Sequence, residues 1–245
     1  MRLVIAGTMS PGTTAVHFAE LAGAGGHDVR RLSTYDEVGP VRRALAGTDA
    51  AVLVPKRGDA RLHAQQAMRT LLAAAAELPT PPRILLVSSF VVGHGNAHPL
   101  SRVDATQLPA RIASEEDLRA CGLPYTIVRP TWLTDDPPGA HAITLTQDPQ
   151  ADGMVSRADI AVALVAAIES GRAVRTTFGL FSEPGAPPAD WAAAYARLQP
   201  DARSGPQSGP RPGPQSGPRP APRPDAQPDA QSDPQPDAAP DKEPV

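Results

Sequence analysis

The chain has 245 residues, a formal net charge of −3 and one cysteine, and 14 of its 30 prolines lie at or after Pro200. The single Cys121 excludes a disulfide framework and a cysteine-based zinc site. No apolar run approaches the roughly 18 residues of a membrane-spanning helix, and the near-balanced charge gives no electrostatic reason to expect nucleic acid as a partner. We therefore expect a cytoplasmic protein that binds neither membrane nor nucleic acid.

The last fifth of the chain differs from the rest in composition. All nine aromatic residues lie before Pro200, and the segment Gly205–Pro212 is repeated unchanged as Gly213–Pro220. Without core-forming residues, such a segment cannot bury enough apolar surface to offset the entropy of ordering. We predict a folded domain over residues 1–198 and a disordered Pro/Gln/Asp-rich tail over 199–245.

Short apolar runs and helical patterns alternate along residues 1–198. The run Leu3–Ala6 predicts a first strand, and apolar residues from Ala15 to Ala22 predict a helix after it. The patterns that follow predict strands at 27–32, 50–54, 83–88, 125–128, 142–146 and 177–181, and helices at 38–45, 60–78, before Cys121, at 158–170 and around Trp191. This alternation predicts an α/β fold with a doubly wound parallel sheet, whose ligands bind at the carboxyl ends of the strands.

The turn after the first strand is a candidate dinucleotide site. In such sheets, glycines in this turn let the backbone approach a pyrophosphate, which lies against the N-terminus of the following helix. This turn has two glycines, Gly7 and Gly12, where the usual fingerprint has three. The hydroxyls of Ser10 and of Thr13 or Thr14 either bond phosphate or cap the helix. A dinucleotide site and a helix cap that binds nothing therefore both remain open, and the position of the turn favours the first.

Six segments occur in an order that is typical of one family. They are Gly7–Gly12, Ala44–Ala50, Leu86–Ser89, Glu115–Leu123, Tyr125–Pro130 and Ser156–Ala161. Together they resemble the NAD(P)H-binding, atypical short-chain dehydrogenase/reductase group, which includes NmrA-like regulators and flavin or biliverdin-type reductases. The resemblance covers about residues 1–198. It implies a Rossmann-like fold with the cofactor along the first loop, Ser88 and Ser89 beside the nicotinamide, and Pro130 and Thr131 closing over it.

Between Leu32 and Val38 the sequence is shorter than the family pattern. Only five residues lie there, so we expect one edge strand to be shortened or lost and the adenosine side of the pocket to be thinner. Arg30 and Arg31 are the nearest basic candidates for the ribose phosphate of NADP, and the alternative for both is a solvated strand edge. The expected cofactor is NADP or NAD, with NADP slightly favoured.

The Tyr-x-x-x-Lys pair of typical short-chain dehydrogenases is absent. Gln107 and Arg111 stand at its two positions; glutamine cannot protonate an alkoxide, and arginine is not a titratable base. Pro109 between them argues against a continuous helical turn. Arg111 is expected either to bind a ribose or phosphate oxygen or to form a salt bridge with Glu115 at the i,i+4 spacing.

The candidate catalytic residues are Ser88, His94 and Arg111. Ser88 either bonds a substrate carbonyl or caps the end of its strand. His94 and His98 are the candidate proton donors of the following loop, with a solvent-exposed loop as the alternative; the Gly and Pro content around them argues against a metal site, and we predict none. The candidate cofactor contacts are Gly7, Thr8, Met9, Ser10, Gly12, Thr13, Arg30, Arg31, Val54, Ser88, Ser89, Pro130 and Thr131.

Two hypotheses for function follow from these features. The first is an oxidoreductase that transfers a hydride between a nicotinamide dinucleotide and a small organic substrate, with the proton supplied by solvent or a loop histidine. The second is a non-catalytic NmrA-like regulator, sensing a dinucleotide or binding a partner, whose cofactor site is eroded. A sugar-nucleotide epimerase fits less well because it too relies on the absent tyrosine. The sequence leaves the oligomeric state open.

Overall fold

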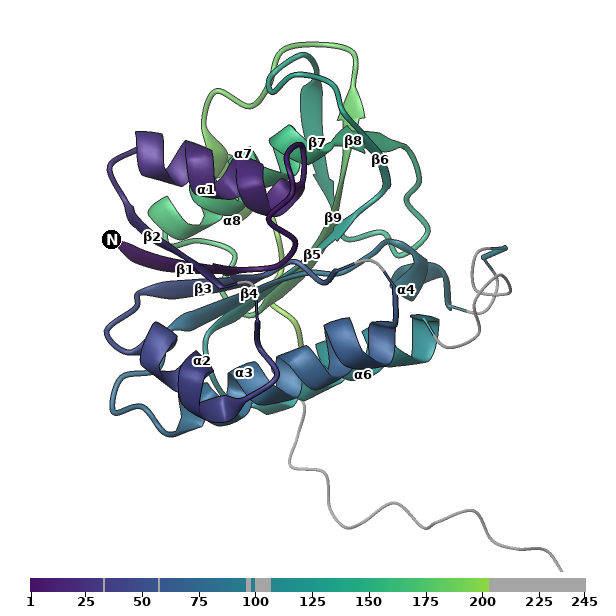
Figure 1. Ribbon diagram of the computed structural model, residues 1–245. Helices are drawn as coiled ribbons and strands as arrows, with labels where there is room; N and C mark the ends of the chain where they lie inside the picture. Colours follow the sequence, from purple (N-terminus) through teal and green to yellow (C-terminus); the bar gives the residue numbers. More distant parts are fainter. Residues whose placement is uncertain (33, 57, 96–97, 100–106, 203–245) are drawn as a thin grey trace, which may run out of the picture. The chain divides into compact units, whose positions relative to one another are not determined.

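The computed structural model describes residues 1–32, 34–56, 58–95, 98–99 and 107–202. Within them lies a seven-stranded sheet with the order β2-β1-β3-β4-β5-β9-β7 (Figure 1). Its strands are β1 (Arg2–Ala6), β2 (Asp28–Leu32), β3 (Ala50–Leu53), β4 (Arg83–Val87), β5 (Tyr125–Pro130), β7 (Ala142–Thr146) and β9 (Thr176–Glu183). Neighbouring strands are parallel except for β7 and β9. Beside it, β6 (Trp132–Thr134) and β8 (Met154–Ser156) form a second, parallel pair.

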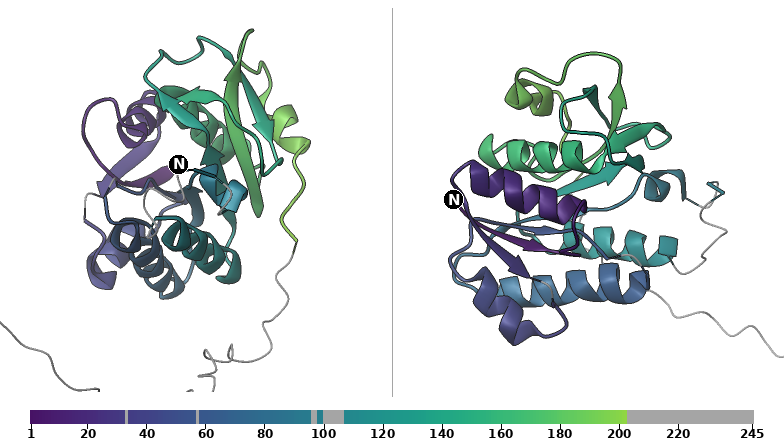
Figure 2. Two further views of the ribbon diagram at one scale, coloured as in Figure 1. Left: turned by 90° about the vertical axis from the view of Figure 1, so that its right-hand side faces the viewer. Right: turned by 45° about the horizontal axis from the view of Figure 1, so that its top comes forward.

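Helices cover both faces of the sheet, as Figures 1 and 2 show. One face carries α1 (Thr14–Ala24), α7 (Arg157–Glu169) and α8 (Trp191–Ala196), and the other carries α2 (Val38–Leu45), α3 (Ala67–Ala76) and α6 (Gln107–Ala120). A buried apolar cluster fills each interface, so the strands are apolar on both sides, as parallel sheets require. The doubly wound α/β prediction is confirmed. None of the described helices is long and apolar enough to cross a membrane.

The helices that frame the carboxyl edge begin at side-chain caps. The hydroxyl of Thr13 accepts from the N–H of Val16 at the start of α1, at 3.4 Å. At the start of α7, the hydroxyl of Ser156 accepts from the N–H of Asp159 at 2.9 Å and donates to the Asp159 carboxylate at 2.8 Å. These caps satisfy N–H groups that have no acceptor within the helix. Local sequence therefore fixes where both helices begin, next to the candidate site.

The strand β2 lies at one edge of the sheet, and its connection to α2 is short. No described residue forms a strand outside β2, which is consistent with the expectation that one edge strand is shortened or lost. The chain passes from Leu32 to Val38 and enters α2 directly.

Two expectations about helices are wrong in detail. The helix expected over 60–78 consists of a π-helix, η1 (Arg61–Gln66), followed by α3. The break expected at Pro109 does not occur, because α6 runs from Gln107 through Pro109 to Ala120. Pro109 lies in the first turn, where a backbone N–H has no acceptor within the helix, so proline costs little there.

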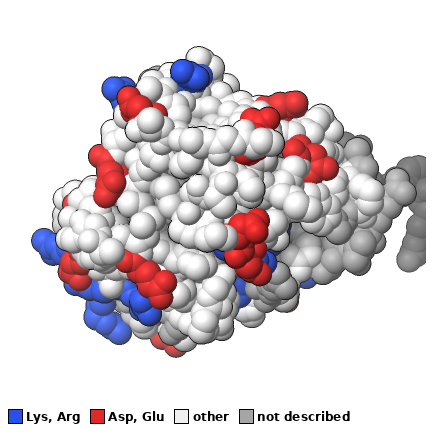
Figure 3. All heavy atoms as spheres, turned by 90° about the horizontal axis from the view of Figure 1, so that it is seen from above, with Lys and Arg blue, Asp and Glu red and all other residues white. Residues whose placement is uncertain are grey.

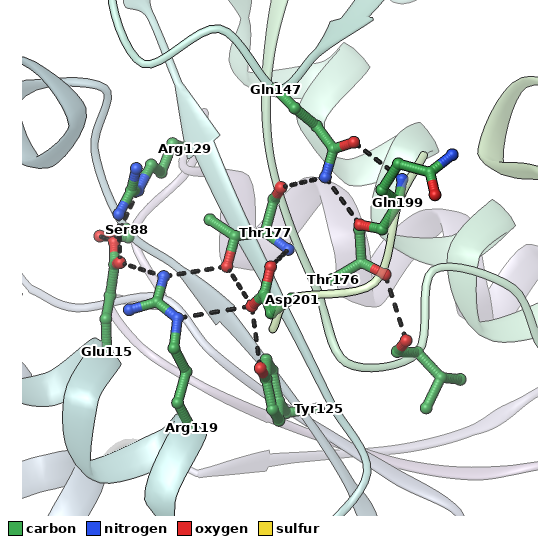
Figure 4. A network of polar contacts seen from close by, with 11 residues as sticks. Ser88, Glu115, Arg119, Tyr125, Arg129, Gln147, Thr176, Thr177, Gln199 and Asp201 are labelled. Carbon is green, nitrogen blue, oxygen red and sulfur yellow. Dashed lines mark hydrogen bonds and ion pairs between the residues drawn. The ribbon is translucent and has the colours of Figure 1, made fainter. Parts of the chain in front are cut away.

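Contacts of the folded part extend past the predicted boundary at Leu198. The N–H of Gln199 donates to the side chain of Gln147 at 2.8 Å. The Asp201 carboxylate accepts from the Tyr125 hydroxyl at 2.8 Å and from the Thr177 N–H at 2.9 Å (Figure 4). Residues up to Asp201 are therefore tied to β5 and β9. The remainder of the predicted tail, residues 203–245, lies outside the described residues.

Candidate cofactor site

A cavity of about 420 Å³ lies at the carboxyl ends of β1, β3, β4 and β5. Pockets for small molecules and cofactors have volumes of roughly 300 to 1,000 Å³, and this edge is where doubly wound sheets bind their ligands. The lining residues are Thr8, Thr13, Thr14, Val54, Pro55, Lys56, Val87, Ser88, Arg111, Pro130, Leu133, Arg157 and Ile160.

The first loop is built for close packing of backbone against backbone. A Cβ atom at the buried Gly7 would lie 2.7 Å from the carbonyl oxygen of Val54 and 3.3 Å from the Cβ of Ala15, so only glycine fits. Gly12 has φ +74°, a conformation that favours glycine. The Thr13 hydroxyl lies 2.8 Å from the carbonyl oxygens of both Thr8 and Ser10 and donates to one of them. Thr13 is therefore the helix cap, and its hydroxyl proton is used within the loop.

The cavity concentrates positive charge. Among its described lining residues are three basic side chains, those of Lys56, Arg111 and Arg157, and no carboxylate. Arg157 donates to the carbonyl of Thr134 at 3.3 Å and pairs with the exposed Asp135, and the Lys56 ammonium lies 5.0 Å from the ring centroid of Tyr35. On the outer face in Figure 3, by contrast, acidic and basic groups are interspersed. The lining therefore suits an anionic ligand.

Arg111 is the basic residue most available to a ligand. Within the described part of the chain, its guanidinium has no hydrogen bond or ion pair, so the salt bridge to Glu115 considered from the sequence does not form. Burial lowers the pKa of Arg111, and the nearby charge of Glu115 opposes that effect. The group stays charged at neutral pH and presents donors in a planar fork that fits phosphate oxygens.

Glu115 is instead the centre of a network that ends at the cavity (Figure 4). Its carboxylate is fully buried and accepts from Arg119 at 2.8 Å and from Arg129 at 2.6 and 3.0 Å. The hydroxyl of Ser88 donates to the same carboxylate at 2.5 Å. The network thus connects β4, β5 and α6, three elements whose sequence segments carried the family resemblance.

The structure brings six of the fifteen predicted site residues together in the cavity lining. Thr8, Thr13, Val54, Ser88, Arg111 and Pro130 line the cavity, while Gly7, Met9, Ser10 and Gly12 belong to the loop beside it. Arg30 donates to the carbonyl of Ala44 at 3.0 Å and Arg31 is exposed on β2, and neither is in the lining. The Ser89 hydroxyl accepts from the N–H of Val91 at 3.4 Å, where α4 (Val91–His94) begins.

Two further candidates lie away from the cavity. His94 has its Nε2 atom 3.3 Å from the carbonyl of Ala151, and its ring packs edge-on against Phe90 and His98. Thr131 donates to the carbonyl of Leu180 at 3.2 Å and lines a second cavity of about 230 Å³, which also contains Arg119 and Arg129. His94 is therefore not placed with Ser88 and Arg111. In the described residues, no group of three or more His, Cys, Asp or Glu side chains could hold a metal ion.

Sequence reasoning missed several lining residues, notably Lys56, Leu133 and Arg157. Lys56 follows β3 closely, so its place at the carboxyl edge could have been inferred. Arg157 belongs to Ser156–Ala161, one of the segments that carry the family resemblance, and its position at the start of α7 could have indicated that it lies near the ligand. Leu133 lies on β6, which no sequence pattern indicated.

The comparisons with known proteins agree with this geometry. A family model described as NAD(P)H-binding matches residues 14–171. A search of curated proteins found no significant match. Among solved structures, the oxidoreductase ylbE from Lactococcus lactis superposes with a TM-score of 0.65 at 14% identity, covering 80% of this chain and 95% of its own.

Two other solved structures are similar at comparable levels. An anaerobillin reductase from Escherichia coli O157:H7 has a TM-score of 0.61 at 18% identity, covering 76% of this chain and 100% of its own. A wide-type short-chain dehydrogenase/reductase from Veillonella parvula, in complex with NADP, has a TM-score of 0.57 at 17% identity, covering 77% and 98%. These likenesses establish a shared fold, and the family model covers more than half of the chain. The chain therefore belongs to the NAD(P)H-binding family.

Proposed function

We propose that the protein is an NADP(H)-dependent oxidoreductase whose cofactor occupies the 420 Å³ cavity. The observation that carries this proposal is a lining with three basic side chains and no described carboxylate, at the N-terminus of α1 and beside the glycine-only contact at Gly7. A helix N-terminus and unpaired guanidinium donors are the groups that bind a pyrophosphate.

The lining also gives the cofactor an orientation. In this proposal the phosphates lie against Thr8, Thr13 and Thr14, and the nicotinamide reaches Ser88 and Pro130, all of which line the cavity. Arg111 is suited to a phosphate or ribose oxygen. Val87, Leu133 and Ile160 supply apolar contacts that exclude water from the nicotinamide end. Bound nicotinamide supplies the carbon that gives or accepts a hydride.

The proton that accompanies the hydride comes from solvent in this proposal. None of the cavity's described lining residues is a tyrosine or a histidine. The substrate is a small organic molecule, which approaches past Trp132 and Leu133 on β6; both side chains are exposed, at 42% and 43%. The similarity to the ylbE oxidoreductase and the anaerobillin reductase supports redox chemistry on this fold.

NADP is proposed in preference to NAD because positive charge surrounds the cavity. Besides the three lining cations, Arg30 and Arg31 lie on β2, the strand that flanks the adenosine in the proposed binding mode. An arginine near this point accommodates the 2′-phosphate of NADP, whereas an acidic residue there selects NAD. The similar structure that contains NADP is consistent with this choice.

Calorimetric titration of the full chain with NADPH and NADH tests the cofactor site. Arg111→Gln removes one charge from the cavity, and Arg43→Gln removes one from an exposed position on α2. We expect wild type to bind NADPH more tightly than NADH. A charged hydrogen bond contributes about 1.5–3 kcal/mol, so Arg111→Gln should weaken NADPH binding by roughly 10- to 100-fold, and Arg43→Gln by less than about twofold. No binding at millimolar NADPH and NADH, or equal losses in the two variants, would overturn the proposed site.

Turnover is tested separately. Oxidation of NADPH is followed by absorbance with a panel of quinones, flavins and carbonyl compounds. Reduction of at least one compound class is expected, with a rate that Arg111→Gln lowers. Tight NADPH binding without oxidation across the panel would contradict the oxidoreductase and favour a dinucleotide-sensing regulator.

A further inference from the structure

Ser88 stands where β4 ends and the cavity begins. Its side chain is buried, its N–H donates to the carbonyl of Val128 at 2.7 Å, and the residue is part of the cavity lining. Two neighbours in the lining, Val87 and Pro130, have apolar side chains. Ser88 is therefore a polar residue between apolar neighbours, at the end of the cavity that the nicotinamide occupies in the proposed function.

The single proton of the Ser88 hydroxyl already has an acceptor. It is donated to Oε1 of Glu115 at 2.5 Å, and that oxygen also accepts from Nε of Arg129 at 3.0 Å. The other oxygen, Oε2, accepts from Arg129 at 2.6 Å and from Arg119 at 2.8 Å (Figure 4). A carboxylate between two guanidinium groups only accepts hydrogen bonds, so it cannot return a proton to Ser88.

The network also prevents Glu115 from turning away. Its side chain is 0% exposed, and rotation would take the counter-ion away from Arg129 and leave Arg119 with only the Asp201 carboxylate, at 3.4 Å. Both arginines are themselves mostly buried, with side chains 23% and 19% exposed. Breaking such a pair leaves buried charge uncompensated, which is strongly unfavourable. The direction of the Ser88 O–H bond is therefore fixed by the fold.

A hydroxyl has one donor and two acceptor lone pairs. Since the donor of Ser88 points at Glu115, only lone pairs remain for the cavity. A ligand carbonyl placed against Ser88 would meet a second acceptor, whereas an N–H or O–H group would be satisfied. The hydrogen bond to a substrate carbonyl considered from the sequence thus has no proton available.

We propose that Glu115 is a positioning residue that makes Ser88 an obligate hydrogen-bond acceptor, so that this end of the cavity selects ligands with a donor group. In the dinucleotide that donor is the NH₂ of the nicotinamide carboxamide. The inference rests on the proposed function, because it requires the dinucleotide to occupy the cavity. It adds a chemical criterion: the site recognises the amide nitrogen, not the amide oxygen, at Ser88.

The experiment compares two probes by calorimetry with the full chain. One is NADP, and the other is its acetylpyridine analogue, in which a methyl group replaces the carboxamide NH₂ and the carbonyl is kept. We expect wild type to bind the analogue about tenfold more weakly. Ser88→Ala should bring the two affinities to within about twofold, because the acceptor is gone. Ser170→Ala is the control and should leave the tenfold ratio unchanged, since the Ser170 hydroxyl accepts from the N–H of Arg172, outside the lining.

Glu115→Gln tests the positioning role. Its NH₂ group can donate to Ser88, which frees the hydroxyl proton to point into the cavity, so the preference for NADP should also fall to within about twofold. A purely structural role would weaken both probes equally and preserve the ratio, so an unchanged ratio in a folded Glu115→Gln would overturn the inference. If that variant does not fold, Ser88→Ala keeps the test decisive.

The wild-type result separates the two proposals. Equal binding of both probes by wild type would overturn the inference while the cofactor site stands. If Ser88→Ala kept the tenfold ratio, the inference would also be overturned, because a residue other than Ser88 would then bind the carboxamide nitrogen. If neither probe binds at millimolar concentration, the proposed function fails and this inference fails with it.

Discussion

Replacing Gly7 by alanine tests whether the first loop depends on close backbone packing. The new Cβ would lie 2.7 Å from the carbonyl oxygen of Val54, which is a steric clash. That oxygen belongs to backbone, and the N–H of Val54 is itself held by the carbonyl of Ala6 at 2.8 Å. The end of β3 must therefore shift, and it carries Val54 and Pro55 of the cavity lining with it.

The cost follows from the kind of strain. Forcing one extra carbon into a tightly packed position costs about 1–3 kcal/mol. For a domain of this size each kcal/mol lowers Tm by roughly 2–4 °C, so Gly7→Ala should lower Tm by about 2–12 °C. The same shift should weaken NADPH binding by roughly tenfold or more, since displacement of a lining segment degrades several contacts at once.

Gly23→Ala is the matched control. Gly23 lies in α1, and a Cβ there would meet nothing within 4 Å. Alanine should therefore stabilise the helix by about 0.4–1 kcal/mol and leave NADPH affinity unchanged. Thermal unfolding followed by circular dichroism, together with calorimetric titration, gives both quantities. If Gly7→Ala is as stable as Gly23→Ala and binds NADPH as wild type does, the reasoning about the loop is refuted.

Two further predictions concern the stability of the folded part. A chain ending at Leu198 should have a lower free energy of unfolding than one ending at Ala202, by about 1.5–3 kcal/mol, because it loses the Asp201 carboxylate and its hydrogen bonds to Tyr125 and Thr177; equal Tm values for the two chains would contradict this role. Burial raises the pKa of Tyr35 to about 12, although the backbone of Lys56 acts in the opposite direction. Its contribution to stability is therefore full below about pH 10, the pKa of an unfolded tyrosine, and is lost as the pH rises to about 12. Tyr35→Phe should flatten the decline of Tm over that interval. If wild type and Tyr35→Phe show the same decline, another group causes it.

The fold was largely predictable because strand and helix signals agreed over most of the chain. Short apolar runs such as Leu3–Ala6, bounded by glycine, are typical of strands buried on both faces of a parallel sheet. The described residues contain no strand outside β2, as the short length between Leu32 and Val38 suggested. The pair β6 and β8 was missed because each strand has three residues, too few to show a period. The break expected at Pro109 was wrong because a proline destabilises the interior of a helix but not its first turn, where Pro109 lies.

The site was predictable where it follows directly from a strand end. Ser88 and Val54 fall on the carboxyl edge by register alone, and both line the cavity. Side-chain pairing was not predictable from spacing. Glu115 can reach Arg111, Arg119 or Arg129, and which of them it binds depends on the packing of α6 against β5, which sequence does not display. That choice leaves Arg111 free for a ligand.

The most direct measurement is a crystal structure of the full chain grown with NADP. We predict that the pyrophosphate lies against Thr8, Thr13 and the start of α1, that Arg111 contacts a phosphate or ribose oxygen, and that the carboxamide nitrogen lies within hydrogen-bond distance of Ser88. Nucleotide bound elsewhere, for example in the cavity of Arg119 and Arg129, would contradict the account.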